Sequence, residues 1–237
     1  MSQNSAQQSA EIAKFNALAA NWWDPNGPMA PLHWMNPPRL DFIKTHLDKA
    51  GIKSGAHGID VGCGAGLLTE PLARLGYKMT GLDGAEDALK VARHRAAQEG
   101  LNVTYIHGTS EAYAPKDKVD FITALEIVEH VDDPQVFIDG LMKMLKPGGI
   151  LFMSTLNRTL KSRLIAIYAA EYVLRALPIG THDYEKFIRP SELSAMVEKA
   201  GGSVKELTGL AFSPLKQSFR LAPREMDINY IMCAKKR

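Results

Sequence analysis

Cysteine is scarce in this sequence of 237 residues, which contains only Cys63 and Cys233. Two cysteines cannot build the disulfide framework of a small secreted domain, so a reducing compartment is expected. The sequence also lacks an uncharged apolar run of about 18 residues, so no transmembrane helix is predicted. Residues 1–10 are largely polar and uncharged, without the basic and then apolar plan of a signal peptide. These absences predict a cytoplasmic protein.

A strong imbalance of charge is absent as well. The chain carries 28 lysines and arginines against 26 aspartates and glutamates, for a net charge of +2. This balance does not indicate a basic surface for nucleic acid, and no nucleic-acid partner is predicted. Hydrophobic residues make up 46% of the chain, which is enough for the core of one large domain with additions.

The most informative segment is a glycine-rich loop. Gly62, Gly64 and Gly66 stand at alternate positions directly after the short apolar run 58–61, and a helical pattern begins at once behind them. A strand, a tight loop and a helix in this order form the usual site of a nucleotide-like cofactor in an α/β sheet. The alternative is that the three glycines only make a tight turn.

The spacing of the glycines distinguishes two classes of cofactor. A dinucleotide-binding loop needs its third glycine at position 67, where this chain has Leu67. A pyrophosphate usually also calls for a basic residue at the loop, and residues 58–73 contain none. The loop therefore favours S-adenosylmethionine, which has no phosphate, over NAD. Asp60, just before the first glycine, is predicted to face the ammonium group of this cofactor, directly or through water.

A second acidic residue strengthens this interpretation. Residues 77–82 have the pattern of a strand, and Asp83 stands at its end. Its separation from Asp60 is close to the roughly 20 residues at which an acid binds the ribose hydroxyls of a nucleotide. Asp83 also suits the N-terminal cap of the helix predicted over 85–98, and the two roles are compatible.

Strands and helices alternate along the chain. The strands are predicted over residues 58–61, 77–82, 103–107, 119–125, 150–154, 203–207 and 228–234, and the helices over 67–75, 85–98, 134–145 and 190–200. This alternation predicts an α/β fold, a mostly parallel seven-stranded sheet with helices on both faces. Only a loop separates the last two strands, which predicts an antiparallel edge strand. The pattern is that of a Rossmann-like class I methyltransferase.

Two regions lie outside this alternation. Residues 1–50 are predicted to form a helical cap, with helices over 11–20 and 40–47, ahead of an S-adenosylmethionine-binding domain over 51–237. The second region is an insertion at about 157–189, which is predicted to be a lid. The chain is therefore expected to add a cap and a lid to one core domain.

Three side chains of the cap are candidates for the cofactor site. Trp22 and Trp23 suit the anchoring of a core better than the stacking of a ligand. Arg39 suits either the surface or a bidentate ion pair with the carboxylate of the cofactor, because a guanidinium matches a carboxylate in geometry.

The lid contains an uncharged apolar segment, residues 164–170, flanked by Lys161, Arg163 and Arg175. This segment is too short to span a bilayer, and the apolar residues of the lid helix cover most of a helical wheel. Such a helix either packs under the lid or presents an apolar face to a lipid-like substrate or a membrane surface.

Three residues behind the strand over 119–125 have the most reactive side chains. Glu126, Glu129 and His130 follow the spacing i, i+3, i+4, so a helical turn would put them on one face. Methyl transfer to oxygen requires the acceptor to lose its proton, and His130 is a suitable general base. The same three side chains are suitable ligands for a divalent cation such as Mg²⁺, with a catechol completing the shell. A structural role in the turn is the third alternative.

Several segments together resemble the ubiquinone biosynthesis O-methyltransferase family. The glycine loop is common among methyltransferases, whereas three other motifs are much narrower: Trp22-Trp23-Asp24, Asn36-Pro37-Pro38-Arg39-Leu40 and Ser154-Thr155-Leu156-Asn157-Arg158. The similarity extends from about residue 11 to the C-terminus.

The resemblance implies specific roles for residues of this chain. Cofactor contacts are implied for Arg39, Gly62, Asp83 and Leu125, where relatives often have methionine at position 125. Some relatives use the Glu-x-x-Glu-His motif for Mg²⁺, and all three of its positions, from Glu126 to His130, are present here.

The resemblance also implies a reaction and its partners. The expected activity is transfer of a methyl group from S-adenosylmethionine to a catechol-type hydroxyl of polyprenylated ubiquinone precursors, in both O-methylation steps. A polyprenyl tail favours contact of residues 160–177 with a membrane surface, hence a peripheral place on the inner face of the cytoplasmic membrane. A complex with other ubiquinone-synthesis proteins is a further expected partner. The alternatives are another small-molecule class I methyltransferase and a non-catalytic subunit with the same fold.

Overall fold

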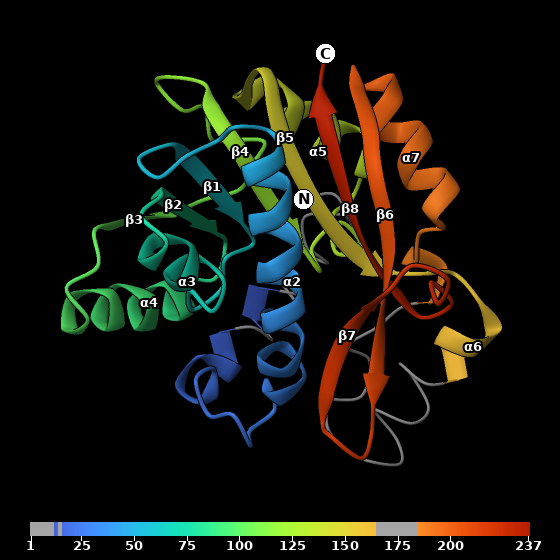
Figure 1. Ribbon diagram of the computed structural model, residues 1–237. Helices are drawn as coiled ribbons and strands as arrows, with labels where there is room; N and C mark the ends of the chain where they lie inside the picture. The colour runs from blue at the N-terminus through green and yellow to red at the C-terminus, as the bar shows by residue number, and fades with distance from the viewer. Residues whose placement is uncertain (1–11, 14–15, 165–183) are drawn as a thin grey trace, which may run out of the picture.

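One sheet organises the computed structural model, which describes residues 12–13, 16–164 and 184–237 (Figure 1). Within these residues the sheet has eight strands. Their spatial order is β3 (Val103–His107), β2 (Lys78–Asp83), β1 (His57–Val61), β4 (Val119–Leu125), β5 (Leu145–Leu156), β8 (Asn229–Lys236), β6 (Gly202–Ser213) and β7 (Ser218–Ala222).

The first five strands of this order are parallel, and β8, β6 and β7 each pair antiparallel with the preceding neighbour. The prediction of a mostly parallel α/β sheet with an antiparallel edge is therefore confirmed. The predicted number of seven strands is too low by one, because β7 was missed. Its sequence, Ser-Phe-Arg-Leu-Ala, is short and half polar, and it becomes a strand by pairing along β6.

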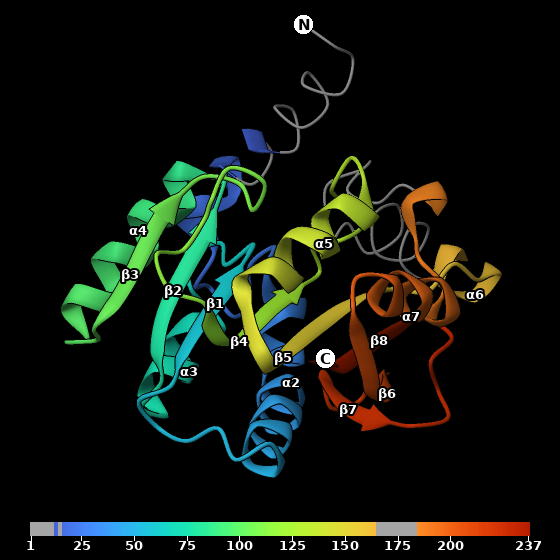
Figure 2. The same ribbon diagram turned by 90° about the horizontal axis from the view of Figure 1, so that it is seen from above.

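Helices cover both faces of the sheet, as predicted (Figure 2). Successive residues of β5 point to opposite faces, because side chains alternate along a strand. Leu151 and Met153 pack in one cluster with α5 (Pro134–Met144) and α7 (Pro190–Lys199). Ile150 and Phe152 pack in another with α2 (Ala30–Lys49) and α3 (Thr69–Arg74). The helix α4 (Glu86–Gln98) packs on Tyr105 of β3.

The helix α2 corrects one prediction. The helix predicted over 40–47 begins earlier than expected: a single helix of 20 residues starts at Ala30 and runs through Pro37 and Pro38. An interior proline costs a helix about 3 kcal/mol, so contacts outside the helix have to offset it. Its buried face supplies them with Phe42, Ile43 and Leu47, and the side chain of Asn36 donates to the carbonyl oxygen of Leu67 at 2.9 Å.

A local capping arrangement fixes the start of α5. Asp133 is the N-cap, and its carboxylate accepts hydrogen bonds from the backbone N–H groups of Gln135 at 2.8 Å and Val136 at 3.1 Å. Pro134 occupies the first turn, where a missing N–H removes no helical bond. This cap fixes the end of the loop that follows β4.

Some predicted features lie outside the described residues. They are residues 165–170 of the uncharged apolar segment, the part of the lid over 171–183, and residues 11, 14 and 15 of the helix predicted over 11–20. Among the residues that are described, no helix is long and apolar enough to cross a membrane. The division into a cap over 1–50 and a domain over 51–237 stays a prediction.

Candidate active site

The glycine loop has a backbone that other residues rarely adopt. The φ angles of Gly62, Gly64 and Gly66 are +73°, +52° and +86°. Side chains pack directly against this backbone: a Cβ atom on Gly64 would lie 2.1 Å from the ring of Trp22, and one on Gly62 would lie 2.5 Å from Ile127. Both conformation and space therefore require glycine here, beyond the needs of an ordinary turn.

The tryptophan pair holds the loop from the N-terminal side. Trp22 is buried, and the indole N–H of Trp23 donates to the carbonyl oxygen of Ala65 at 2.9 Å. The guanidinium of Arg95, on α4, lies 3.6 Å from the centre of the Trp23 ring, within cation–π range. The prediction that these tryptophans anchor the core is confirmed, and the part they anchor is the glycine loop.

Asp83 stands at the end of β2 and links the loop to α4. One carboxylate oxygen accepts from the backbone N–H of Gly64 at 2.7 Å, and the other accepts from that of Ala85 at 2.7 Å. Burial raises the pKa of Asp83, and these two hydrogen bonds oppose the rise. Each oxygen keeps acceptor capacity, since a carboxylate oxygen can accept two bonds. The predicted N-cap role is wrong, because Ala85 is the N-cap of α4 and Asp83 binds the N–H of that residue ahead of the helix. The role as a ligand for a ribose diol stays a prediction.

Asp60 stands at the end of β1 and is almost completely buried. Its two oxygens accept hydrogen bonds from the hydroxyl groups of Thr69 and Thr123, each at 2.6 Å. Burial raises the pKa of Asp60 to about 6, although the two hydroxyl groups favour the ionised form. Among the described residues, no cationic side chain forms an ion pair with Asp60. This buried carboxylate is therefore a fitting partner for an ammonium group.

Replacement of Asp60 by asparagine is expected to stabilise the free protein more at high pH than at low pH. The pKa is about 6 in the folded chain against an ordinary 3.8, so the folded state binds more protons and its stability falls as the pH rises between these values. The advantage of Asp60→Asn over the parent chain is expected to be on the order of 1 kcal/mol larger at pH 8 than at pH 5. Thermal unfolding at the two pH values measures it, and an equal shift at both would contradict it.

Leu125 and Glu126 mark the end of β4. Leu125 is partly buried in the cluster that lies under α2. Glu126 has a φ of +53°, which is uncommon for a residue with a side chain. Its carboxylate accepts from Arg39 Nη2 at 2.5 Å, from Ser154 Oγ at 2.6 Å and from Asn229 Nδ2 at 3.0 and 3.1 Å. The side chain is therefore directed at Arg39 and the sheet.

Arg39 lies in this cluster and not on the surface. Its side chain is 2% exposed, and burial lowers its pKa while Glu126 and Glu129 oppose that change. Within the described part of the chain, its hydrogen bonds all come from Nη2, and its buried Nε has no partner. The guanidinium therefore has N–H groups left for a second carboxylate.

Glu129 and His130 lie in a turn and not in a helix. Glu129 is buried and accepts from the hydroxyl of Thr155 at 2.9 Å. Burial and the nearby Glu126 raise its pKa to about 7, while His130 opposes the rise. His130 is half-buried, and its backbone N–H donates to the carbonyl oxygen of Ile127 at 2.9 Å.

The predicted Mg²⁺ ligands do not form a metal site in this structure. The expectation that Glu126, Glu129 and His130 share one helical face is not met, because the segment is a turn that begins at a positive φ. Glu126 is bound to Arg39, and no group of three His, Cys, Asp or Glu side chains among the described residues has the arrangement of a metal site. These residues do not fit the cation, and no step of the chemistry is assigned to one.

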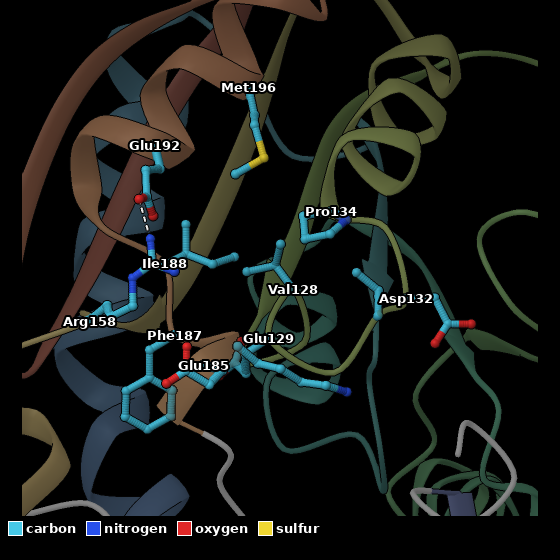
Figure 3. Close-up of a pocket in the computed structure, with 12 residues that line it drawn as sticks. Val128, Glu129, Asp132, Pro134, Arg158, Glu185, Phe187, Ile188, Glu192 and Met196 are labelled. Carbon is cyan, nitrogen blue, oxygen red and sulfur yellow. Dashed lines mark hydrogen bonds and ion pairs between the residues drawn. The ribbon is translucent and has the colours of Figure 1, made fainter. Parts of the chain in front are cut away.

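A cavity of about 470 Å³ lies beside Glu129 (Figure 3). Val128 and Ile188 face one another across it, and Met196 reaches toward them from α7. An ion pair between Arg158 and Glu192 lies at its side. The lining combines apolar and charged side chains: Val128, Glu129, Val131, Asp132, Pro134, Arg158, Glu185, Lys186, Phe187, Ile188, Glu192 and Met196.

Sequence reasoning missed the polar partners of the site. Thr69, Thr123, Ser154 and Thr155 all hold a carboxylate through a hydroxyl group. For Thr123, Ser154 and Thr155 the available signal was a hydroxyl residue inside or near the end of an apolar strand, whereas Thr69 begins α3 and carried no such signal. Asn229, on β8, carried no such signal, because nothing near it in the sequence relates it to Glu126.

Known proteins share this sequence over its length. The methyltransferase domain family matches residues 59–153. A ubiquinone biosynthesis O-methyltransferase of Dinoroseobacter shibae is 46% identical over 231 residues, which cover 94% of this chain and 93% of the relative. One of Idiomarina loihiensis is 47% identical over 228 residues, covering 95% and 92%. The chain belongs to the ubiquinone biosynthesis O-methyltransferase family. The sequence-based predictions of this family and of an S-adenosylmethionine-dependent methyltransferase are confirmed.

Solved structures agree in fold. Magnesium protoporphyrin IX methyltransferase from Synechocystis with bound SAH has a TM-score of 0.72 at 16% identity, covering 98% of this chain and 100% of the other. A possible histamine N-methyltransferase from Thermotoga maritima has a TM-score of 0.68 at 20% identity, covering 96% and 100%. At these identities the likeness concerns the fold alone, and it confirms the Rossmann-like class I prediction.

Proposed function

We propose that this chain transfers the methyl group of S-adenosylmethionine to a catechol-type hydroxyl of a polyprenylated ubiquinone precursor. The observation that carries the proposal is near-full-length identity of 43–47% to ubiquinone biosynthesis O-methyltransferases. The location of the site supports it, because Asp60, Asp83 and Glu126 come from the carboxyl ends of parallel strands. Ligands of open α/β sheets bind at those ends.

The cofactor side is assigned to five parts of this chain. The backbone of Gly62 to Gly66 admits the cofactor closely, and Asp83 accepts from its ribose hydroxyls. Asp60 faces its ammonium group, Arg39 binds its carboxylate, and Leu125 packs on its adenine. When bound, S-adenosylmethionine supplies an electrophilic methyl group on a sulfonium.

The acceptor side is assigned to His130. Its imidazole takes the proton of the catechol hydroxyl as the oxygen attacks, so that the methyl–oxygen bond forms while the sulfur–methyl bond breaks. The products are S-adenosylhomocysteine, a methoxy group and the proton held on His130. Orientation of the two reactants contributes much of the remaining rate enhancement, since well-placed groups can lower the activation barrier by roughly 7–11 kcal/mol relative to free solution.

Turnover tests this proposal directly. The assay measures transfer from labelled S-adenosylmethionine to a short-tailed catechol precursor, with and without EDTA. Transfer that survives EDTA supports the proposal as stated. Transfer that EDTA abolishes would contradict the role of His130 as a base acting alone, because it would show that the reaction needs a cation. Transfer only to other acceptors would identify a different small-molecule methyltransferase. Cofactor binding without any turnover would identify a non-catalytic subunit.

The cavity beside Glu129 is the proposed place of the acceptor. It adjoins the turn that carries His130, and its apolar wall suits an aromatic ring and the first units of a prenyl tail. Four acidic against two basic side chains line it, Glu129, Asp132, Glu185 and Glu192 against Arg158 and Lys186, which disfavours an anionic acceptor.

Filling this cavity is expected to weaken acceptor binding selectively. Met196→Trp adds a ring where Met196 faces Val128 and Ile188, so the KM for the acceptor should rise about tenfold or more with the Kd for S-adenosylhomocysteine unchanged. Ala195→Trp is the matched control, because Ala195 lies on the same helix but is exposed and does not line the cavity. Equal KM values for the two variants would contradict the assignment.

A membrane contact through residues 160–177 is also proposed. Leu160 and Leu164, one helical turn apart, are 72% and 61% exposed, and Lys161 and Arg163 beside them are exposed as well. Apolar side chains next to cations suit the surface of an anionic bilayer, and the polyprenyl tail of the acceptor would lie in the same bilayer. A peripheral location on the cytoplasmic membrane and a complex with other ubiquinone-synthesis proteins belong to this proposal, and residues 165–177 lie outside the described chain.

A further inference from the structure

Three segments that are far apart in the sequence meet at the carboxylate of Glu126. Arg39 comes from α2, Ser154 from the end of β5 and Asn229 from the start of β8. Asn229 Nδ2 lies 3.1 and 3.0 Å from the two oxygens of Glu126, and Ser154 Oγ lies 2.6 Å from Oε1. The backbone N–H of Glu126 also donates to the carbonyl oxygen of Ser154 at 2.9 Å. The carboxylate is therefore held in place on several sides.

The backbone of Glu126 indicates that this orientation is needed. A residue with a Cβ atom at a φ of +53° costs roughly 1–2 kcal/mol relative to the right-handed region. The surrounding hydrogen bonds maintain this conformation, which directs the side chain at Arg39. Strain of this kind persists where the contacts around it determine the geometry.

Arg39 needs such a partner before any cofactor arrives. Its guanidinium is almost completely buried, and a buried charge without a counter-ion is strongly unfavourable. Glu126 contacts Nη2 alone, which leaves the buried, unpartnered Nε and the Nη1 group for another acceptor. One carboxylate thus holds the guanidinium while part of its hydrogen-bonding edge stays available.

We propose that Asn229 and Ser154 are positioning residues for the cofactor, which act by holding Glu126 so that Glu126 in turn holds Arg39 toward the carboxylate of S-adenosylmethionine. This inference rests on the cofactor role of Arg39 under the proposed function, and it assigns Glu126 to cofactor binding instead of to a metal. Neither Asn229 nor Glu126 touches the reacting atoms in this scheme.

Binding of two ligands to the full chain tests the proposal. S-adenosylhomocysteine carries the amino-acid carboxylate, and 5′-methylthioadenosine lacks it, so calorimetric Kd values for both isolate the contribution of Arg39. For Asn229→Ala and Glu126→Gln we expect the affinity for S-adenosylhomocysteine to fall at least about tenfold, as for loss of a charged hydrogen bond, with the affinity for 5′-methylthioadenosine unchanged.

Asn157→Ala is the matched control. Asn157 is also a buried asparagine, whose side chain donates to the carbonyl oxygen of Met226 at 2.8 Å and makes no contact with Glu126. It is expected to lower stability without changing the ratio of the two Kd values. The proposal would be overturned if Asn229→Ala lowered the affinity for both ligands equally or lowered neither affinity. It would also be overturned if the parent chain bound both ligands equally well. None of these measurements needs an acceptor, so failure of methyl transfer in the turnover assay is recorded separately.

Discussion

Replacing His130 by alanine is expected to lower kcat by about 10²- to 10⁴-fold, the usual contribution of a general base. The imidazole is the one group of the turn after β4 that is half-buried and suited to take a proton near neutral pH. Binding of S-adenosylhomocysteine should stay unchanged, because His130 is assigned to the acceptor side. Single-turnover methyl transfer and calorimetry measure the two quantities separately.

A matched control and the pH profile make this prediction specific. His94→Ala removes an exposed histidine of α4, far from the turn in the fold, and should leave kcat unchanged. In the parent chain the rate should rise with pH as a base on the free enzyme loses its proton, and this limb should be absent in His130→Ala. A variant with full activity, or one that keeps the same limb, would assign the proton transfer elsewhere.

Gly64→Ala is expected to reduce the affinity for S-adenosylhomocysteine by about 100-fold or more. The left-handed φ of +52° costs alanine roughly 1–2 kcal/mol, and its Cβ would lie 2.1 Å from the ring of Trp22. Trp22 is buried, so the ring cannot move aside without disturbing the loop that Asp83 holds through the N–H of Gly64. Calorimetry with S-adenosylhomocysteine measures the loss.

Two further variants separate space from conformation at Gly64. Gly140→Ala, on α5, adds the same methyl group where nothing lies within 4 Å, and it should leave binding unchanged. In a Trp22→Ala background the overlap is removed, so Gly64→Ala should cost less there than in the parent chain. An equal cost in both backgrounds would mean that the backbone angle alone decides the effect.

The arrangement of the fold was largely predictable because its signals are local. The buried parallel strands show as short apolar runs, and the caps and turns between them depend on neighbouring residues such as Asp133 and Pro134. The edge strand β7 was missed because its strand character comes from pairing with β6. The start of α2 was predicted at residue 40 instead of Ala30 for the opposite reason. Two prolines are a strong local signal against a helix interior, and the packing of the buried face of α2 on the sheet outweighs them.

The cofactor side of the site also has features that local sequence predicts and features that it does not. The conformation of the glycine loop and the acids before and after it are properties of short segments, so the sequence by itself determined their type and order. The spacing of Glu126, Glu129 and His130 wrongly suggested a shared helical face, because a positive φ at one residue redirects the chain. Only the tertiary structure decided that Arg39 is buried against Glu126 and that Ser154 and Asn229 hold this pair. Hydrogen bonds between residues as far apart as Glu126 and Asn229 depend on the packed sheet, which no local pattern encodes.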